Sequence, residues 1–409
     1  MAAMKTRLSG LRIWDGNAGE TSSETLDLHL EAGKIRGLGG FPGGEGWENL
    51  EFPPGAVAIP GLIDAHVHMD LDPHLRAPDD QFIPSRADRD LRMVARAREM
   101  VRAGITTARD LGGGEWRELA LRDAIGRGEL PGPRLVCAGQ PLTIVEGHCH
   151  FWGGVASTGE EQAAVVARQL EHGVDWVKVM ATGGYFTKGS GVDRAQFSAE
   201  EIARAVAQGA VAGLETAAHC HGKAGIFNAA RAGVRTIEHC SFASAKGYGA
   251  DYDAAVVAEV AAQGAWVSPT INGNWLGRME KEGEPTAFFR NMQRVLSELR
   301  AAGIPLLAST DAGIPGVFHH GLSSGLRAFA KYAEIPPVEV LRSATRDSAL
   351  GLGLETICGR LAEGLSADVL VLAGDPLVDL NWLDKPLAVM AAGRLVHLDP
   401  TVSGSNPPA

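Results

Sequence analysis

The stretch PGLIDAHVHMD, residues 60–70, begins as an apolar segment and ends in two histidines, His66 and His68. Side chains two residues apart on a β-strand point to the same face, so both imidazoles are expected on one side of a strand end. Imidazole is a common ligand of divalent metal ions. Two histidines alone also fit a packing or solvent-facing role, so the other strand ends decide the interpretation.

Apolar segments alternate with amphipathic helical patterns along the middle of the chain, for example RADRDLRMVARAREMVRAG at residues 86–104. Such alternation favours parallel strands with crossover helices, and strands buried on both faces explain the uninterrupted apolar runs. Eight units predict a (β/α)8 TIM barrel of the α/β class. The expected strands are residues 61–68, 105–110, 134–139, 176–181, 216–221, 236–240, 266–270 and 305–311.

The two ends of the chain differ from the middle, because they contain short strands separated by turn glycines. They predict a small β-sandwich domain built from residues 1–57 and 359–400, beside a barrel domain of residues 58–358. Residues 401–409 are expected to form a disordered tail.

Composition narrows the class of protein. The chain has 409 residues, a formal net charge of -11 and 45% hydrophobic residues. The acidic balance argues against nucleic-acid and anionic-membrane partners, and no apolar run is long enough for a membrane span. Five cysteines without a CxxC pair are typical of free thiols, and we expect a cytoplasmic protein. A small-molecule substrate fits this composition, and assembly into a homo-oligomer is left open.

Polar residues end several of the other predicted strands. Lys178 lies near the end of the fourth strand, His219 and His239 lie near the ends of the fifth and sixth, and Asp311 ends the eighth. Active-site groups of a (β/α)8 barrel lie at the carboxyl ends of its strands. Chance placement of such residues at five of eight strand ends is improbable, so a metal-dependent active site is predicted.

These motifs resemble the amidohydrolase superfamily. The resemblance rests on the PGLIDxHxH opening, on the strand-end Lys, His, His and Asp, and on GRLAEGLSADVLVLAGDPL near the carboxyl terminus. The stretches VKVMATGG and HCHG are similar to the imidazolonepropionase-like branch, which contains metal-dependent amidases and dipeptidases and ochratoxin-type amidohydrolases.

The resemblance implies a binuclear centre. Lys178 would carry a carbamate that bridges two divalent ions, and zinc is the expected metal. A bridging hydroxide would attack the substrate carbonyl, with Asp311 as general base and then general acid. Six side chains would hold the ions: His66, His68, Lys178, His219, His239 and Asp311.

Other polar residues are candidates for catalysis and substrate binding. His148 follows the third strand and is expected to contact the substrate carbonyl or leaving group. His221 shares a face with His219 and is expected to bind a substrate carboxylate or oxyanion, or to support a metal ligand. Tyr185 is a substrate-binding candidate on the loop after the fourth strand, and His150 is a weaker candidate.

Three further features have mainly structural interpretations. Arg109 is expected to form an ion pair with Asp110, and His319 and His320 are expected to be solvated loop residues. The long segment NGNWLGRMEKEGEPTAFFR after the seventh strand is expected to form one wall of the pocket.

The predicted reaction is hydrolysis of a non-ring amide bond in an N-acyl amino acid or dipeptide-like substrate. One alternative is hydrolysis of a carbamate, urea or ester at the same site. Another is a mononuclear cyclic-amide hydrolase or deaminase, which Lys178 disfavours because a bridging carbamate needs two ions. A catalytically silent scaffold is the third alternative, but it predicts missing ligands, and no ligand position is missing.

Overall fold

The computed structural model describes residues 5–40 and 46–402. Thr401 and Val402 end the described chain in a turn, and Val402 is buried. The rest of the predicted tail, residues 403–409, lies outside the described residues.

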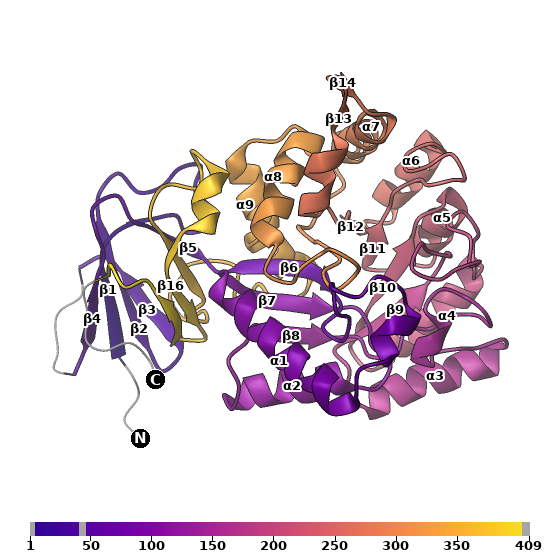
Figure 1. Cartoon of the computed structure of the whole chain (residues 1–409), viewed down its shortest axis with the longest axis horizontal. Coiled ribbons are helices and arrows are strands. Elements are labelled where there is room, and N and C mark those ends of the chain that lie inside the picture. Colours follow the sequence, from indigo (N-terminus) through magenta and orange to yellow (C-terminus); the bar gives the residue numbers. More distant parts are fainter. Residues whose placement is uncertain (1–4, 41–45, 403–409) are drawn as a thin grey trace.

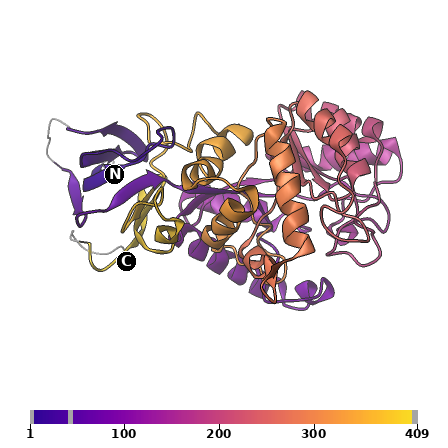
Figure 2. The ribbon, with the colours of Figure 1, turned by 90° about the horizontal axis from the view of Figure 1, so that it is seen from above.

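Strands from both ends of the chain pair in one mixed sheet at one end of the molecule (Figures 1 and 2). The order is β17-β16-β15-β5-β1-β2-β3, and β4 pairs with β1. Its apolar core includes Leu8, Leu28, Ile35 and Val369. The strands are β1 (Lys5–Ile13), β2 (Leu26–Glu31), β3 (Lys34–Leu38), β4 (Glu48–Glu51), β5 (Val57–Pro60), β15 (Val369–Leu372), β16 (Pro386–Ala391) and β17 (Arg394–Leu398).

Parallel strands occupy the middle of the chain and confirm the predicted α/β class. They form a sheet of β6-β7-β8 and a sheet of β12-β11-β10-β9. A bridge between Leu142 and Val179 links the segment after β8 to β9. The strands are β6 (Leu62–Val67), β7 (Ile105–Asp110), β8 (Arg134–Cys137), β9 (Trp176–Met180), β10 (Glu215–Cys220), β11 (Thr236–His239) and β12 (Trp266–Ser268).

The predicted eighth strand, residues 305–311, is not formed as a regular strand. This segment makes isolated bridges instead, from Leu306 to Val267 and from Ala312 to Val67. The main-chain N–H of Asp311 donates to the carbonyl of His66 at 2.9 Å. The segment therefore lies between β12 and β6, and the left-handed φ of 62° at Asp311 interrupts its extended geometry.

Helices surround the parallel strands (Figure 1). The amphipathic pattern quoted at residues 86–104 forms α1, and similar patterns form α3, α4 and α7. Thr158 and Ser198 begin α3 and α4 with capping boxes. The helices are α1 (Arg86–Arg102), α2 (Arg117–Arg127), α3 (Gly159–Glu171), α4 (Ala199–Val211), α5 (Lys223–Arg231), α6 (Ala254–Ala262), α7 (Ala287–Ala301), α8 (Leu322–Ala333), α9 (Pro337–Ser343) and α10 (Arg346–Gly351).

Short elements occur in the connecting loops. A hairpin of β13 (Glu280–Lys281) and β14 (Glu284–Pro285) follows the turn η3 (Gly273–Arg278). Three more 3-10 turns are η1 (Asp79–Phe82), η2 (His150–Trp152) and η4 (Leu380–Asp384). Within the described residues, no helix has both the length and the apolar character needed to cross a membrane.

Candidate metal centre and active site

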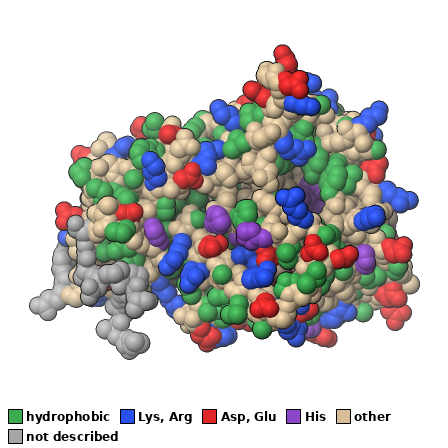
Figure 3. All heavy atoms as spheres, viewed as in Figure 1, with side chains coloured by type: hydrophobic (Ala, Val, Ile, Leu, Met, Phe, Trp, Pro, Cys, Tyr) green, Lys and Arg blue, Asp and Glu red, His purple; other side chains and the backbone are tan. Residues whose placement is uncertain are grey.

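One cavity of about 310 Å³ lies at the carboxyl ends of the parallel strands. The substrate-site candidates His148, His221 and Tyr185 line it. His150 is not among its lining residues; it is exposed, with Nδ1 3.0 Å from the carbonyl of Gly147. In the space-filling view, several histidine side chains are visible near the middle of the face (Figure 3). All six predicted metal ligands line the cavity: His66, His68, Lys178, His219, His239 and Asp311.

A first candidate metal group consists of His66, His68 and Asp311. Oδ1 of Asp311 lies 3.4 Å from Nε2 of His66 and 3.3 Å from Nε2 of His68. The two Nε2 atoms lie 3.3 Å apart. One oxygen and two imidazole nitrogens thus converge on one point, which is the donor chemistry that divalent zinc prefers.

The Nδ1 atoms of this group have partners of their own. Nδ1 of His66 lies 2.8 Å from Oε2 of Glu238, and Nδ1 of His68 lies 2.9 Å from the carbonyl of Gly112. Asp110 holds the Gly112 turn by accepting from its main-chain N–H at 2.9 Å. Such partners fix the tautomer with the proton on Nδ1 and leave Nε2 free to bind a metal.

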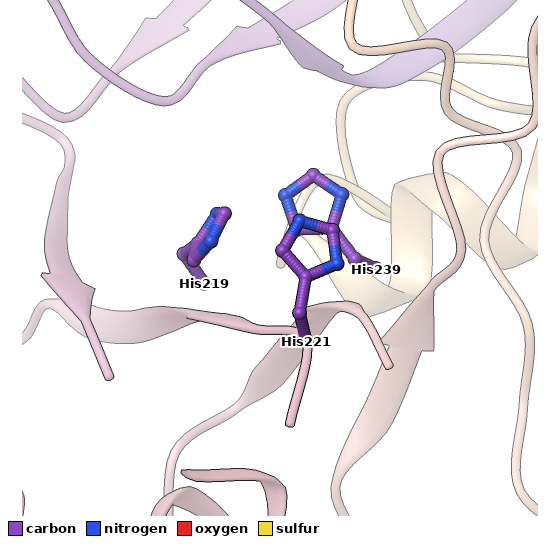
Figure 4. Close-up of side chains that lie close together, drawn as sticks. All are labelled: His219, His221 and His239. Carbon is purple, nitrogen blue, oxygen red and sulfur yellow. The ribbon is translucent and has the colours of Figure 1, made fainter. Parts of the chain in front are cut away.

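A second candidate group brings together His219, His221 and His239 (Figure 4). Their ligand atoms all lie within 4.8 Å of one another. Nδ1 of His221 lies 2.8 Å from Oγ of Ser241, and Nδ1 of His239 lies 2.8 Å from Oγ1 of Thr270. His221, which we predicted as a substrate contact, therefore also fits a role as a ligand in this group.

Burial keeps most of these imidazoles neutral. It lowers the pKa of His66 and of His221 to about 4 each, and it holds the pKa values of His219 and His239 well below the ordinary value. A neutral imidazole has the free lone pair that metal binding requires. His68 is different: burial would lower its pKa, but the facing Asp311 carboxylate raises it.

Lys178 is a buried cation with no hydrogen-bond partner in the described part of the chain. Its side chain is 1% exposed, and Nζ has no hydrogen-bond partner among the described residues. Burial lowers the pKa of this amine to about 8. Its charge acts on His66 in the first group and on His219 and His239 in the second. An unpaired buried ammonium is costly, which sets Lys178 apart from an ordinary structural lysine.

Asp311 is the charged oxygen at this centre. Burial alone would raise the pKa of its carboxyl, but the facing His66 and His68 lower it to about 2. The carboxylate is therefore ionised at neutral pH and can accept a proton. Asp311 and His239 both have a left-handed backbone, with φ of 62° and 65°, and non-glycine residues in this region are frequent at functional sites.

Glu238 is a central residue of the site that our sequence reasoning missed. Its carboxylate is fully buried and joins His66 to Arg109, whose Nη2 donates to Oε1 at 2.8 Å. Strand alternation would place Glu238 and His239 on opposite faces, but the φ of 65° at His239 ends the alternation there. The only sequence signal was an acidic residue inside an apolar strand, since such residues are rarely buried unpaired.

The prediction that Arg109 pairs with Asp110 is wrong. Arg109 forms its ion pair with Glu238, while Asp110 accepts main-chain N–H groups from Met69 and Gly112. Adjacent residues of a strand point to opposite faces, so a side-chain pair between neighbours is unfavourable.

The prediction that His319 is solvated is also wrong. His319 is buried, and its Nε2 lies 3.0 Å from the carbonyl of His68, so it supports the main chain of the first metal group. His320 is exposed, as predicted for a loop residue.

His148, Tyr185 and Trp275 also line the cavity. The ring of His148 lies 4.4 Å from that of His219, and burial lowers its pKa to about 3. Tyr185 is 56% exposed and stacks on Tyr248, with ring centres 5.4 Å apart. Trp275 lines the cavity, as expected for the segment after β12, whereas Phe288 packs behind it at 4.8 Å.

Comparison with known proteins agrees with this geometry. The model of the amidohydrolase family matches residues 57–396, so the chain belongs to that family. It is a hydrolase acting on carbon–nitrogen bonds, as predicted, and the family depends on metal ions.

Individual relatives support the same class. Ochratoxinase of Aspergillus niger is 26% identical over 360 residues, which cover 81% of this chain and 73% of that protein. The solved structure of an amidohydrolase is 26% identical with a TM-score of 0.84, covering 97% of this chain and 100% of the other. A putative prolidase from Bifidobacterium longum is 26% identical with a TM-score of 0.78, covering 97% and 95%.

Proposed function

We propose that this chain is a binuclear metal-dependent hydrolase that cleaves the amide bond of an N-acyl amino acid or dipeptide-like substrate. One observation carries the proposal. Two candidate metal groups lie in the same cavity. The charge of the buried Lys178 lowers the pKa of imidazoles in both groups, and its Nζ has no hydrogen-bond partner among the described residues.

The proposal includes the architecture that holds the site. The parallel strands close into a (β/α)8 barrel over residues 58–358, with segment 305–312 in the place of the eighth strand. Its bridges to Val267 and Val67 on either side support closure. The chain ends, predicted as residues 1–57 and 359–400, would form the small β-sandwich domain beside it, with residues 1–4 and 41–45 of that prediction outside the described residues.

The donor set fits two divalent ions, with zinc the expected metal. His66, His68 and Asp311 would hold one ion, and His219 and His239 would hold the other, with His221 beside them. When bound, the pair supplies an activated water and polarises the substrate carbonyl. Lys178 would contribute oxygen ligands to both ions as a carbamate.

The environment of Lys178 supports carboxylation. Only a neutral amine attacks CO2, and the pKa of about 8 makes the neutral form accessible near physiological pH. The nitrogen forms a bond to carbon, one N–H proton leaves to solvent, and the product is an anionic carbamate. The same step removes the unpaired ammonium from the buried site.

Several side chains of this chain would act on the substrate directly. Asp311, ionised at neutral pH, would accept a proton from the attacking water and deliver it to the leaving nitrogen. His148 and His221 are kept neutral by burial and can each donate one N–H to a developing oxyanion or to the leaving group. Tyr185, which lines the cavity, would contact the substrate.

The relatives and the cavity together support this substrate class. The putative prolidase is named for dipeptide cleavage, and the cavity mixes polar groups at its floor with Trp152, Tyr248 and Trp275 on its walls. An amide with an apolar substituent fits this lining.

The direct test measures metal content and hydrolysis together. We expect about two zinc ions per chain in protein produced with added bicarbonate and zinc, together with release of free amino acids from a panel of N-acyl amino acids. A stoichiometry of one ion under all conditions would overturn the binuclear proposal.

A further inference from the structure

The charged residues of the cavity are unevenly placed. Apart from the histidines, the lining contains Lys178 and Asp311 in the metal region and one other charged residue, Arg76. Arg76 is exposed and belongs to the loop between β6 and α1, so its guanidinium is the cation that an entering substrate meets.

Arg76 has no acidic partner. Within the described ranges, no carboxylate lies within 4.0 Å of its guanidinium. The acidic side chains earlier in its loop are already engaged: Asp70 contacts Arg117, and Asp72 contacts Arg92 at 2.8 Å. Of the other carboxylates in the loop, Asp79 is exposed and Asp80 accepts from the main-chain N–H of Ala77 at 3.4 Å, and neither forms an ion pair with Arg76. The Arg76 guanidinium is therefore free to meet an external anion.

The main chain that precedes Arg76 is held in place by Gln81, which is buried. Its side-chain oxygen accepts from the main-chain N–H of Asp72 at 2.8 Å. Its side-chain nitrogen donates to the carbonyls of Asp72 at 3.1 Å and of Leu75 at 3.4 Å. The loop therefore fixes the base of the Arg76 side chain while its guanidinium remains uncommitted.

The cavity next to Arg76 is apolar. Leu71 and Pro78 come from the same loop, and Trp152, Phe186 and Ile314 come from other loops at this end of the strands. Leu71 and Trp152 belong to one buried cluster against which Phe186 and Ile314 pack. A ligand that suits this part of the cavity combines an apolar side chain with an adjacent negative charge.

We propose that Arg76 binds the carboxylate of the substrate's leaving amino acid, so that the enzyme selects N-acyl amino acids with apolar side chains over uncharged amides. This inference rests on the proposed hydrolase function and specifies its substrate. A guanidinium offers two parallel N–H groups that match both oxygens of a carboxylate, which a lysine would match less well.

The solvent exposure of Arg76 limits the size of the expected preference for a carboxylate. Because Arg76 is exposed, solvent and salt screen its interaction with the carboxylate. We expect a preference of about tenfold, which corresponds to the roughly 1.4 kcal/mol of a modest charge-assisted contact. The preference should shrink as salt rises from about 0.05 to 0.5 M, since the screening length falls over that range.

The test uses two substrates with the same scissile amide, N-benzoyl-L-phenylalanine and N-benzoylphenethylamine, which lacks only the carboxylate. In the zinc-loaded enzyme, Arg76→Gln should lower kcat/KM for the first substrate by about tenfold, mainly through KM, and leave the second unchanged. Arg76→Lys should restore part of the loss. Arg98→Gln is the matched control, because Arg98 is exposed on α1 and does not line the cavity.

Binding separates this inference from the proposed function. Calorimetric titration with the same two compounds reports the carboxylate preference even if neither is hydrolysed. A preference in the parent that Arg76→Gln removes and Arg98→Gln keeps would support the inference. Equal affinities in the parent, equal losses for both compounds, or a preference that survives Arg76→Gln would overturn it, whereas binding without hydrolysis would count against the proposed function alone.

Discussion

Arg109 on β7 and Lys178 on β9 are two buried cations with opposite surroundings. Arg109 donates to the carbonyl of Ala65, to Oγ1 of Thr236 and to Glu238 at 2.8–2.9 Å, and it lies over the ring of Trp176. Nζ of Lys178 has no partner among the described residues. Both are almost completely inaccessible to solvent.

The comparison separates a structural charge from a reactive one. Burial lowers the pKa of both side chains, but the Glu238 carboxylate opposes this effect for Arg109. The Glu238 charge also raises the pKa of Lys178, although without a hydrogen bond. Burial outweighs this effect, and the pKa of Lys178 falls to about 8. Burial of a charge is thus a weak indicator of function, and an uncompensated buried charge in a cavity is a stronger one.

The largest expected effect is loss of activity in Lys178→Met. Removing the amine removes the proposed ligand shared by both ions, so hydrolysis should fall by about 10³-fold or more. The free energy of unfolding of the metal-free protein should stay equal or rise, because an unpaired buried ammonium is replaced by an apolar chain.

Turnover, metal content and urea denaturation check this prediction. Lys188→Met is a control, because Lys188 is an exposed lysine on the loop after β9. Parent-like hydrolysis by Lys178→Met would contradict the reactive role of Lys178 and erase the contrast with Arg109.

Arg109→Met tests the other side of the comparison. It leaves the Glu238 carboxylate buried without its cation, so the free energy of unfolding should fall by about 3–5 kcal/mol. Urea denaturation of the metal-free protein measures this change.

A second variant keeps this prediction specific. Adding Glu238→Gln to Arg109→Met should recover part of the lost stability, because the unpaired charge is then gone. A loss below about 1 kcal/mol in the single variant would mean that Arg109 is as weakly compensated as Lys178.

The variant Glu238→Gln tests whether the carboxylate that pairs with Arg109 also supports metal binding. The carboxylate contacts His66 at 2.8 Å and holds the tautomer that leaves Nε2 free. Its neutralisation should weaken zinc binding by about 10- to 100-fold. Chelator competition gives the dissociation constants, and Glu215→Gln at the exposed start of β10 is the control. Unchanged zinc affinity would restrict Glu238 to pairing with Arg109.

Glu118 extends the comparison to a buried carboxyl group without a hydrogen-bond partner among the described residues. Neither of its carboxylate oxygens has a hydrogen-bond partner among the described residues, and burial, followed by the nearby Asp110, raises its pKa from 4.5 to about 8. The folded state therefore holds a proton that the unfolded chain loses above pH 4.5. The contribution of Glu118 to stability falls as pH rises from about 4.5 to 8.

Glu118→Gln should remove this pH dependence, and its effect on stability should be the smallest among these variants. Its Tm should exceed that of the parent by about 1–3 °C at pH 8, and the difference should shrink towards pH 5. Thermal scans of the metal-free protein across this range measure it, with the exposed Glu20→Gln as control. A constant difference across the range would show that Glu118 does not titrate as its surroundings indicate.

Local pattern was sufficient for most of the elements. The seven regular parallel strands lie where the apolar runs predicted them, because burial on both faces leaves a clear signal in composition. The eighth differs, since the backbone at Asp311 turns into the left-handed region, and this turn has no glycine to announce it. The pairing of Arg109 was also beyond local pattern, because Glu238 is distant in sequence.

From the sequence alone, the resemblance of its motifs indicated the family and the class of reaction. Strand periodicity, which is a local property, indicated the six polar side chains near the strand ends. Only the tertiary structure decided which buried charges are compensated. It joined Glu238 to His66 across 172 residues, left Nζ of Lys178 without a hydrogen-bond partner among the described residues, and placed Arg76 on the cavity wall. Compensation depends on what distant segments bring within about 3 Å of a charged atom, and local periodicity does not encode that distance.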